Sequence, residues 1–440
     1  VTDIPAFYLN LSLKSGAPRE PGKPREAGID FSELGQFARD VIAKRIEQLP
    51  QTAMVDISGV VTPELLCIPD YTKLTSMGVG IGLLENAIAD NNVSLGALSI
   101  KDGQYRYSIH FDSRIISKED IENISQIHIV ACGSAWHVGM VAQYVIEDLA
   151  RIPVRVELAS EFRYRNPIID KDALVIIISQ SGETADSLAA LREAKSRGIK
   201  TLGIVNVVGS SIAREADNVF YTLAGPEISV ATTKAYSTQL IASYILAIEF
   251  AMVRGQINQE QYDGFLSELS ELPDKIQKII DDKERLQWFA SKQANAKDIF
   301  FVGRGIDYAI SLEGSLKLKE ISYIHSEAYA AGELKHGTIS LIEDGTLVIG
   351  VLTQNGLYEK TISNMVECKS RGAYLMGLTT YGNYNIEDTV EFATYIPKTD
   401  EHFAASLAVI PLQLLAYYVS VAKGLDVDKP RNLAKSVTVE

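Results

Sequence analysis

The stretch Ala173–Ser187, ALVIIISQSGETADS, decides the fold, because an apolar run meets a polar turn and then a helix rich in alanine and leucine. A continuous run of branched apolar residues is typical of a strand buried on both faces of a parallel sheet. Hydroxyl groups and unpaired backbone N–H groups at a helix start suit a phosphate, since the helix dipole attracts anions. Serine and threonine also simply cap helices, so the turn alone leaves both interpretations open.

The same alternation of buried strands and helices continues on both sides of this stretch. It includes IHIVACGS (127–134) and TLGIVNV (201–207), and it restarts at DIFFVGRGI (298–306) and GTLVIGVLTQNG (345–356). In each copy a strand ends in a glycine-containing turn, a helix follows, and the next strand ends in a polar turn. The pattern predicts two related α/β lobes, residues 115–255 and 283–425, joined by linking helices over 256–282 and followed by a tail, 426–440.

The first part of the chain has a different texture. Residues 15–28, SGAPREPGKPREAG, are too rich in proline and glycine for helix or strand. Around them, strand-like and helix-like runs follow in the order β-α-β-β-α-β up to about residue 112. This order predicts a small ferredoxin-like α+β domain over residues 1–112.

Composition narrows the class of function. The 42 basic and 56 acidic residues give a net charge of −14, which argues against nucleic acid as the main partner. Three separated cysteines, Cys67, Cys132 and Cys368, indicate neither a disulfide framework nor a metal cluster. No apolar run reaches about 18 residues and the N-terminus lacks a signal-peptide pattern. We therefore expect a cytoplasmic protein without metal, cofactor or membrane contact.

Two segments carry further candidate chemistry. Within Glu313–Gly337, a helix would place Glu313, Lys317 and Glu320 on one face. A charge run is usually a solvated face, but a carboxylate beside a lysine also suits proton transfer between adjacent carbons. His336 follows in a glycine-flanked loop, where a histidine can exchange protons near neutral pH. The same histidine could equally be structural.

The tail, DVDKPRNLAKSVTVE (426–440), is the second segment. Chain ends are disordered by default. Pro430 and the apolar residues after it could instead seat the tail in a cleft, where Lys435 would offer an amine to a sugar ketone.

At these motifs the chain resembles the isomerase half of the glutamine–fructose-6-phosphate aminotransferases, from about residue 117 to 440. The motifs are CGSAWHVG (132–139), ELASEFRYRNP (157–167), SQSGETADS (179–187), EISVATTKAYSTQ (227–239), LKLKEISYIHSEAYAAGELKHG (316–337) and the tail. The resemblance implies two sugar-isomerase (SIS) lobes, a homodimer and no cofactor. It implies fructose 6-phosphate, glucose 6-phosphate and glucosamine 6-phosphate as ligands.

The resemblance also assigns roles residue by residue. Glu320 would move a proton between C1 and C2 with help from Lys317, His336 of the neighbouring subunit would open the ring, and Lys435 would form an imine. The residues that would contact the sugar phosphate are Ser134, Ser179, Gln180, Ser181, Thr184, Val230, Thr232 and Ala434. Ala135, where many members have serine, and Thr338, in place of a proline, depart from the family pattern.

The N-terminal part does not fit this family. Its members begin with a glutaminase domain whose first residue is a nucleophilic cysteine, whereas this sequence starts at Val1 and Cys67 lies in a strand-like run. We therefore expect no glutamine hydrolysis. Residues 1–112 instead resemble a porter subdomain of a resistance–nodulation–division efflux transporter. A composite chain, with its seam near 112–117, is the resulting hypothesis.

Three functions remain to be weighed. The first is a sugar-phosphate isomerase that makes glucosamine 6-phosphate with ammonia and glucose 6-phosphate without it. The second is a non-catalytic sugar-phosphate sensor, for which the SQSGET turn would suffice. The third, an efflux component, lacks the membrane helices it would need. A sensor has no use for Glu320, His336 and Lys435 together, so the sequence favours the enzyme.

Overall fold

The computed structural model describes residue 42, residues 98–102 and 105–109, and residues 121–435. The predicted ferredoxin-like domain therefore lies outside the described residues, apart from Ile42 and two short strands. These strands, β1 (Leu98–Asp102) and β2 (Tyr105–Ile109), pair antiparallel. Except for residue 42, the described residues belong to one unit of the chain, residues 94–440.

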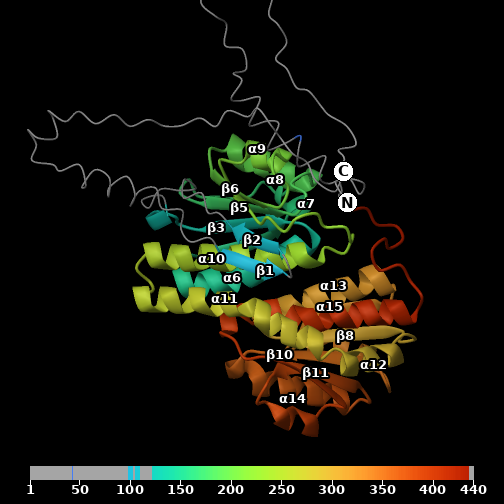
Figure 1. The fold of residues 1–440 in the computed structure, drawn as a ribbon. Coiled ribbons are helices and arrows are strands. Elements are labelled where there is room, and N and C mark those ends of the chain that lie inside the picture. The colour runs from blue at the N-terminus through green and yellow to red at the C-terminus, as the bar shows by residue number, and fades with distance from the viewer. Residues whose placement is uncertain (1–41, 43–97, 103–104, 110–120, 436–440) are drawn as a thin grey trace, which may run out of the picture. The chain divides into compact units, whose positions relative to one another are not determined.

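The first lobe is a five-stranded parallel sheet with helices on both faces (Figure 1). Its strand order is β4-β3-β5-β6-β7, and every neighbouring pair is parallel. The strands are β3 (Ile127–Ala131), β4 (Val154–Leu158), β5 (Leu174–Ser179), β6 (Lys200–Val205) and β7 (Asn218–Tyr221). The helices are α6 (Gly133–Ala150), α7 (Ala159–Phe162), α8 (Ala185–Ser196), α9 (Ser211–Glu215) and α10 (Thr233–Val253).

The second lobe repeats this topology. Its sheet has the order β9-β8-β10-β11-β12, again fully parallel, so β8 corresponds to β3 and β10 to β5. The strands are β8 (Asp298–Gly303), β9 (His325–Ala330), β10 (Leu347–Leu352), β11 (Tyr374–Thr380) and β12 (Phe392–Ile396). The main helices are α13 (Ile306–Ser322), α14 (Tyr358–Lys369) and α15 (Ala404–Ala422), with α11 (Gln259–Asp281) and α12 (Glu284–Lys292) between the lobes. The predicted pair of parallel α/β lobes is confirmed.

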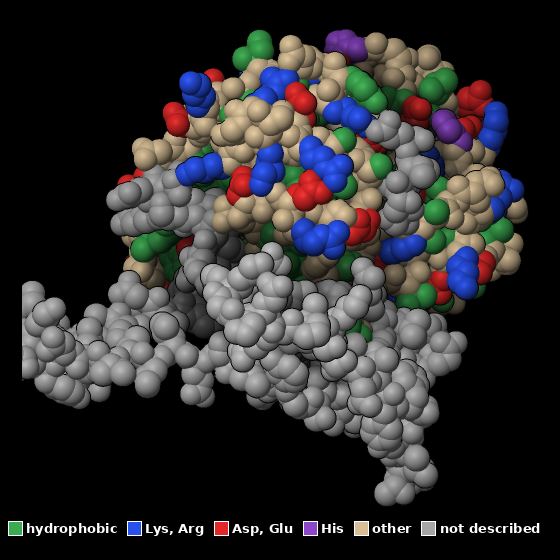
Figure 2. Space-filling model, turned by 90° about the horizontal axis from the view of Figure 1, so that it is seen from above, with side chains coloured by type: hydrophobic (Ala, Val, Ile, Leu, Met, Phe, Trp, Pro, Cys, Tyr) green, Lys and Arg blue, Asp and Glu red, His purple; other side chains and the backbone are tan. Residues whose placement is uncertain are grey.

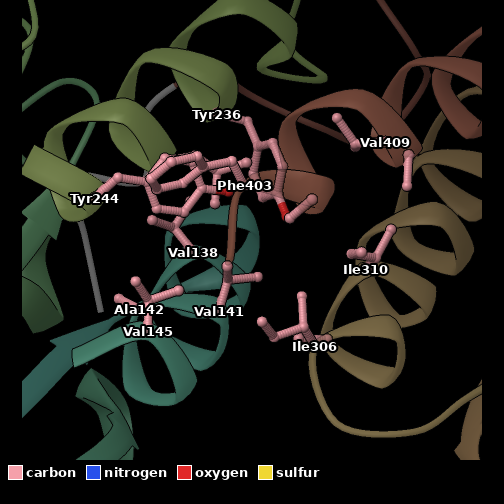
Figure 3. Close-up of a cluster of buried hydrophobic side chains, with 14 of the residues drawn as sticks. Val138, Val141, Ala142, Val145, Tyr236, Tyr244, Ile306, Ile310, Phe403 and Val409 are labelled. Carbon is pink, nitrogen blue, oxygen red and sulfur yellow. The ribbon is translucent and has the colours of Figure 1, made fainter. Parts of the chain in front are cut away.

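The largest hydrophobic core lies between the two sheets. Helices α6 and α10 of the first lobe pack against α13 and α15 of the second, and one continuous cluster of buried side chains joins all four. Figure 3 shows Tyr244 of α10 beside Phe403, which precedes α15, and their rings lie 5.0 Å apart between centroids. Separate, smaller clusters fill the outer faces under α8 and α14. This shared core fixes α13 against the first lobe.

Two stretches of this core are long and apolar, although no uninterrupted apolar run in the sequence reaches about 18 residues. By length and composition, α10 and a stretch that includes α15 both meet the criteria for a membrane span. About two-thirds of each stretch is buried within the fold, as expected of core helices in a two-sheet packing.

The outer face of the first lobe carries paired charges. Arg192 on α8 lies 2.6 Å from Glu215, and Lys195 lies 2.7 Å from Asp217. On the face shown in Figure 2, basic and acidic side chains lie next to one another over the described surface.

Candidate active site

The polar turn after β5 is built around its own hydroxyl groups. The Gly182 N–H donates to Ser179 Oγ at 3.0 Å, and the Glu183 N–H donates to Ser181 Oγ at 3.2 Å. Ser179 Oγ also lies 3.1 Å from the Thr184 hydroxyl. Thr184 stands at the N-cap of α8 without making a side-chain capping bond to the helix. The hydroxyls therefore shape the turn ahead of α8, and two of the backbone N–H groups of the turn donate to them.

This turn stands where the strand order reverses. β3 and β5 are neighbours in the sheet, and β3 leads through α6 to β4 on its other side. In open α/β sheets, ligands bind at such a switch point, beyond the carboxyl ends of the strands. The turn after β3 contains Gly133, at φ 56°, and the buried Ser134. Ser134 and the SQSGET turn thus share one edge of the sheet.

Helix α13 of the second lobe brings a buried row of charges to the first. Lys317 is 3% exposed, and its Nζ lies 2.5 Å from Glu320 Oε2 and 3.5 Å from Glu313 Oε1. Burial would lower the pKa of Lys317, but Glu313 and Glu320 outweigh it and raise that pKa above its ordinary value. Lys317 therefore stays charged. The i, i+4 and i+7 spacing alone could not distinguish this row from a solvated face.

The two carboxylates beside Lys317 have opposite tendencies. Burial raises the pKa of Glu320, and Lys317 opposes that rise without cancelling it. Burial would also raise the pKa of Glu313, but Lys317 and His137 hold it below its ordinary value. Of the two carboxyls, Glu320 is therefore the one that more readily takes up a proton.

His137, on α6, is a site residue that the sequence analysis missed. Its Nδ1 lies 2.7 Å from Glu313 Oε2, and both side chains are buried. Ser134, one helical turn earlier, also hydrogen-bonds Glu313. The first lobe thus supplies two partners for a carboxylate of the second. No local sequence signal marks this pair, because it depends on how α6 packs against α13.

The loop before α10 and the C-terminal tail complete the cluster. Lys317 Nζ donates to the Ala231 carbonyl, while Lys435 Nζ donates to the Ser229 carbonyl at 2.6 Å and to Thr232 Oγ1 at 3.2 Å. Thr232 takes the left-handed backbone conformation, φ 58°, at the start of α10. Both lysines are therefore bound by the same four-residue loop.

The tail is held at two further points. The Val230 N–H donates to the Asp428 carbonyl at 3.0 Å, and the Arg431 N–H donates to the Tyr323 hydroxyl at 2.8 Å. The Arg431 guanidinium also lies 4.2 Å from the Tyr323 ring centroid. Residues up to Lys435 thus follow the loop and the end of α13, in contrast to a free chain end. Ala434 is exposed beside Lys435.

The position of Lys435 against the loop before α10 lowers the pKa of its amine. Burial lowers the pKa of its amine, Glu227 opposes this, and the positive charge of Lys317 lowers the pKa further. A lowered pKa increases the neutral, nucleophilic fraction of an amine. The position therefore suits covalent chemistry with a carbonyl.

One predicted residue is not part of this cluster within a single chain. His336 is exposed in a short 3₁₀ turn, η2 (Leu334–His336), and it is not among the groups that act on the pKa of Glu320 or Lys435. Among the described residues, no three His, Cys, Asp or Glu side chains converge to hold a metal ion. The chemistry the cluster supports is proton transfer and amine–carbonyl condensation.

Comparison with known proteins gives a consistent picture. A family model described as the SIS domain matches residues 120–249 and 293–423. The glutamine–fructose-6-phosphate aminotransferase (isomerizing) of Clostridium tetani is 61% identical over 332 residues, which are 76% of this chain and 55% of that protein. The same-named protein of Caldanaerobacter subterraneus is 59% identical over the same shares. The chain thus spans about half the length of these relatives.

Solved structures agree with the sequence comparison. The C-terminal domain of glucosamine-fructose-6-phosphate aminotransferase from Francisella tularensis has a TM-score of 0.70 and 37% identity, over 79% of this chain and 94% of that domain. A glucosamine-6-phosphate deaminase from Thermotoga maritima has a TM-score of 0.60 and 26% identity, over 73% of this chain and 95% of that one. The resemblance of residues 1–112 to an efflux porter is not supported by these comparisons.

Proposed function

Because the chain belongs to the SIS domain family, we propose that its two lobes form a sugar-phosphate isomerase, the isomerase half of a glucosamine-6-phosphate synthase. Its substrate would be fructose 6-phosphate. The product would be glucosamine 6-phosphate with ammonia and glucose 6-phosphate without it. The observation that carries this proposal is the Lys317–Glu320 pair, bound to the same loop as Lys435.

In the proposed reaction, the phosphate binds at the SQSGET turn and the open-chain sugar extends toward α13. The neutral amine of Lys435 attacks the C2 ketone, and loss of water leaves an imine. Without ammonia, water hydrolyses this imine and frees Lys435 before the proton moves, and Glu320 then transfers a proton from C1 to C2 of the open-chain ketose through an enediol, which leaves the aldose. With ammonia, transimination releases Lys435 and leaves an ammonia-derived imine at C2, and the same proton transfer from C1 to C2 gives the amino aldose. Lys317 holds the Glu320 carboxylate in position.

Ring opening is assigned to His336 of the partner subunit, and this assignment implies a homodimer. Its exposure in the 3₁₀ turn η2 leaves the His336 side chain accessible to a neighbouring chain. Mixing His336→Ala with Glu320→Gln should then restore some activity after subunits exchange, because one hybrid site keeps both groups. No recovery after proven exchange would contradict a shared site. A cytoplasmic location stays a prediction.

The central test is the Glu320→Gln variant. Interconversion of fructose 6-phosphate and glucose 6-phosphate should fall at least ~100-fold, since an amide cannot carry the proton. Glu327→Gln is the matched control, because Glu327 lies seven residues further along and pairs with His325 at the surface. An unchanged rate in Glu320→Gln would remove this carboxylate from the mechanism. Ammonium should serve as the nitrogen source for glucosamine 6-phosphate.

The imine provides an independent test. Borohydride added with fructose 6-phosphate should attach one reduced hexose phosphate at Lys435, and Lys435→Met should abolish the label. Lys429→Met should keep it, because Lys429 is an exposed lysine of the same tail. A label spread over surface lysines, or none on the tail, would show that Lys435 acts only as part of a lid.

A further inference from the structure

The second lobe has a turn that corresponds to the phosphate turn of the first. In the first lobe the strand β3 ends two residues before Gly133, and in the second β8 ends two residues before Gly305. Both glycines are left-handed, with φ 56° and 59°. The strands β5 and β10 are then followed by Ser-Gln-Ser-Gly (179–182) and Thr-Gln-Asn-Gly (353–356). Each lobe thus has its own switch point.

The two lobes differ in the side chain that comes shortly after the left-handed glycine. Two residues after Gly133 stands Ala135, whereas two residues after Gly305 stands Asp307. The Asp307 side chain is 2% exposed. Its carboxylate accepts the Thr353 N–H at 2.9 Å, the Thr353 hydroxyl at 2.5 Å and the Gln354 N–H at 3.3 Å. An acidic side chain therefore lies on the loop amides where a ligand anion would bind.

A second carboxylate extends this arrangement. Glu401 Oε1, just before α15, accepts the Asn355 N–H at 3.0 Å and the Asn355 side-chain amide at 2.6 Å. Three successive backbone N–H groups, at residues 353, 354 and 355, are thus taken by two carboxylates of the chain itself. Successive amides at a helix start are the usual donors to a bound phosphate.

We propose that the second lobe contains a phosphate-type anion cradle that its own Asp307 and Glu401 carboxylates occupy, so that only the first lobe can accept a phosphate ester. The ligand class excluded is the phosphate monoester, because its dianion would need the same amides. In the first lobe, the short methyl side chain of Ala135 leaves the corresponding place without a carboxylate. We infer the occupied cradle from the difference between the two lobes, and this inference does not depend on the proposed reaction.

The test removes the carboxylates and counts bound phosphate. In Asp307→Ala/Glu401→Ala, calorimetric titration with inorganic phosphate at neutral pH should find one more phosphate per chain than in the wild type. The matched control is Asp307→Asn/Glu401→Gln, which keeps the side-chain volume and should not gain this phosphate. Equal phosphate stoichiometry in the wild type and the alanine variant would overturn the proposal.

Removing both carboxylates can make the alanine variant less stable than the wild type, so a second measurement compares how much phosphate stabilises each protein. Phosphate should raise the thermal midpoint of the alanine variant more than that of the wild type. The reference for both proteins is sulfate-free chloride at equal ionic strength. Equal increments in both proteins would count against the cradle. The reciprocal change, Ala135→Asp, should weaken phosphate binding to the first lobe at least tenfold, and Ala135→Asn should weaken it less. Equal effects of the two would mean that bulk, not charge, matters.

Discussion

His137 and Glu313 are joined by a 2.7 Å hydrogen bond that connects the two lobes inside the protein. Glu313 is fully buried, so each of its partners is needed to keep it ionised. The ionised Glu313 helps to hold Lys317 charged, and Lys317 lies against Glu320, so His137 acts on Glu320 through these two groups as well as by its own charge.

The first prediction concerns this chain of contacts. Replacing His137 by alanine removes one group that holds the pKa of Glu313 down, so the pKa of Glu313 should rise. The isomerisation kcat should fall roughly tenfold and its acid limb should move to higher pH, with little change in KM. A pH series of initial rates measures this.

The control for His137 is His128, another buried histidine paired with a carboxylate, at 3.0 Å from Glu157. His128→Ala should lower stability without moving the acid limb. If the acid limb of the pH–rate profile moves equally in His137→Ala and His128→Ala, the effect of His137 is only structural.

The second prediction concerns the phosphate turn. An alanine Cβ at Gly182 would lie 2.0 Å from Ser210 Oγ, whereas at Gly198 it would meet nothing within 4 Å. Both glycines are left-handed, so each substitution costs roughly 1–2 kcal/mol of backbone strain. In Gly182→Ala, overpacking against Ser210 should lower the free energy of unfolding by at least another ~1 kcal/mol. The same variant should also bind the sugar phosphate more weakly. Denaturant unfolding and calorimetric titration of both variants measure these effects, and equal losses would contradict the prediction.

The third prediction concerns the seat of the tail. Tyr323→Phe removes the acceptor for the Arg431 N–H but keeps the ring under the guanidinium. Loss of one such bond, about 1 kcal/mol, should raise the opened population of the tail roughly fivefold. Trypsin cleavage after Arg431 should speed up by that factor, and KM for fructose 6-phosphate should rise. Tyr384→Phe, at an exposed tyrosine of the same lobe, is the control. Unchanged cleavage would show that the ring contact alone holds the tail.

The fourth prediction concerns pH and stability. Burial raises the pKa of Asp307 to about 6, hydrogen bonds from Thr353 and Gln354 oppose this rise, and Glu401 adds to it. A carboxyl with a raised folded-state pKa contributes stability at low pH that is lost as pH rises through about 6. Relative to Asp307→Asn, which does not titrate, the wild type should therefore lose roughly 1 kcal/mol of unfolding free energy between about pH 5 and pH 7.5. Denaturant unfolding at several pH values measures it, and a pH-independent difference would contradict the assignment.

Sequence reasoning found the elements that depend on local pattern. The buried strands, the glycine turns and the duplicated lobes follow from apolar runs and punctuation, and the structure confirms them. The charged row on α13 was found by helical spacing, although its burial could not be. His137 and Asp307 were missed, because their partners lie 176 and 46 residues away and are set only by packing. The predicted N-terminal domain lies outside the described residues.

The division of the site between two lobes has a consequence for how the protein could arise. The SQSGET turn belongs to one repeat and the charged row of α13 to the other, so neither repeat holds the whole candidate site. A duplicated ancestral gene would acquire this chemistry only after the copies fused and began to diverge. The two lobes therefore share one topology but contribute different parts of the candidate site.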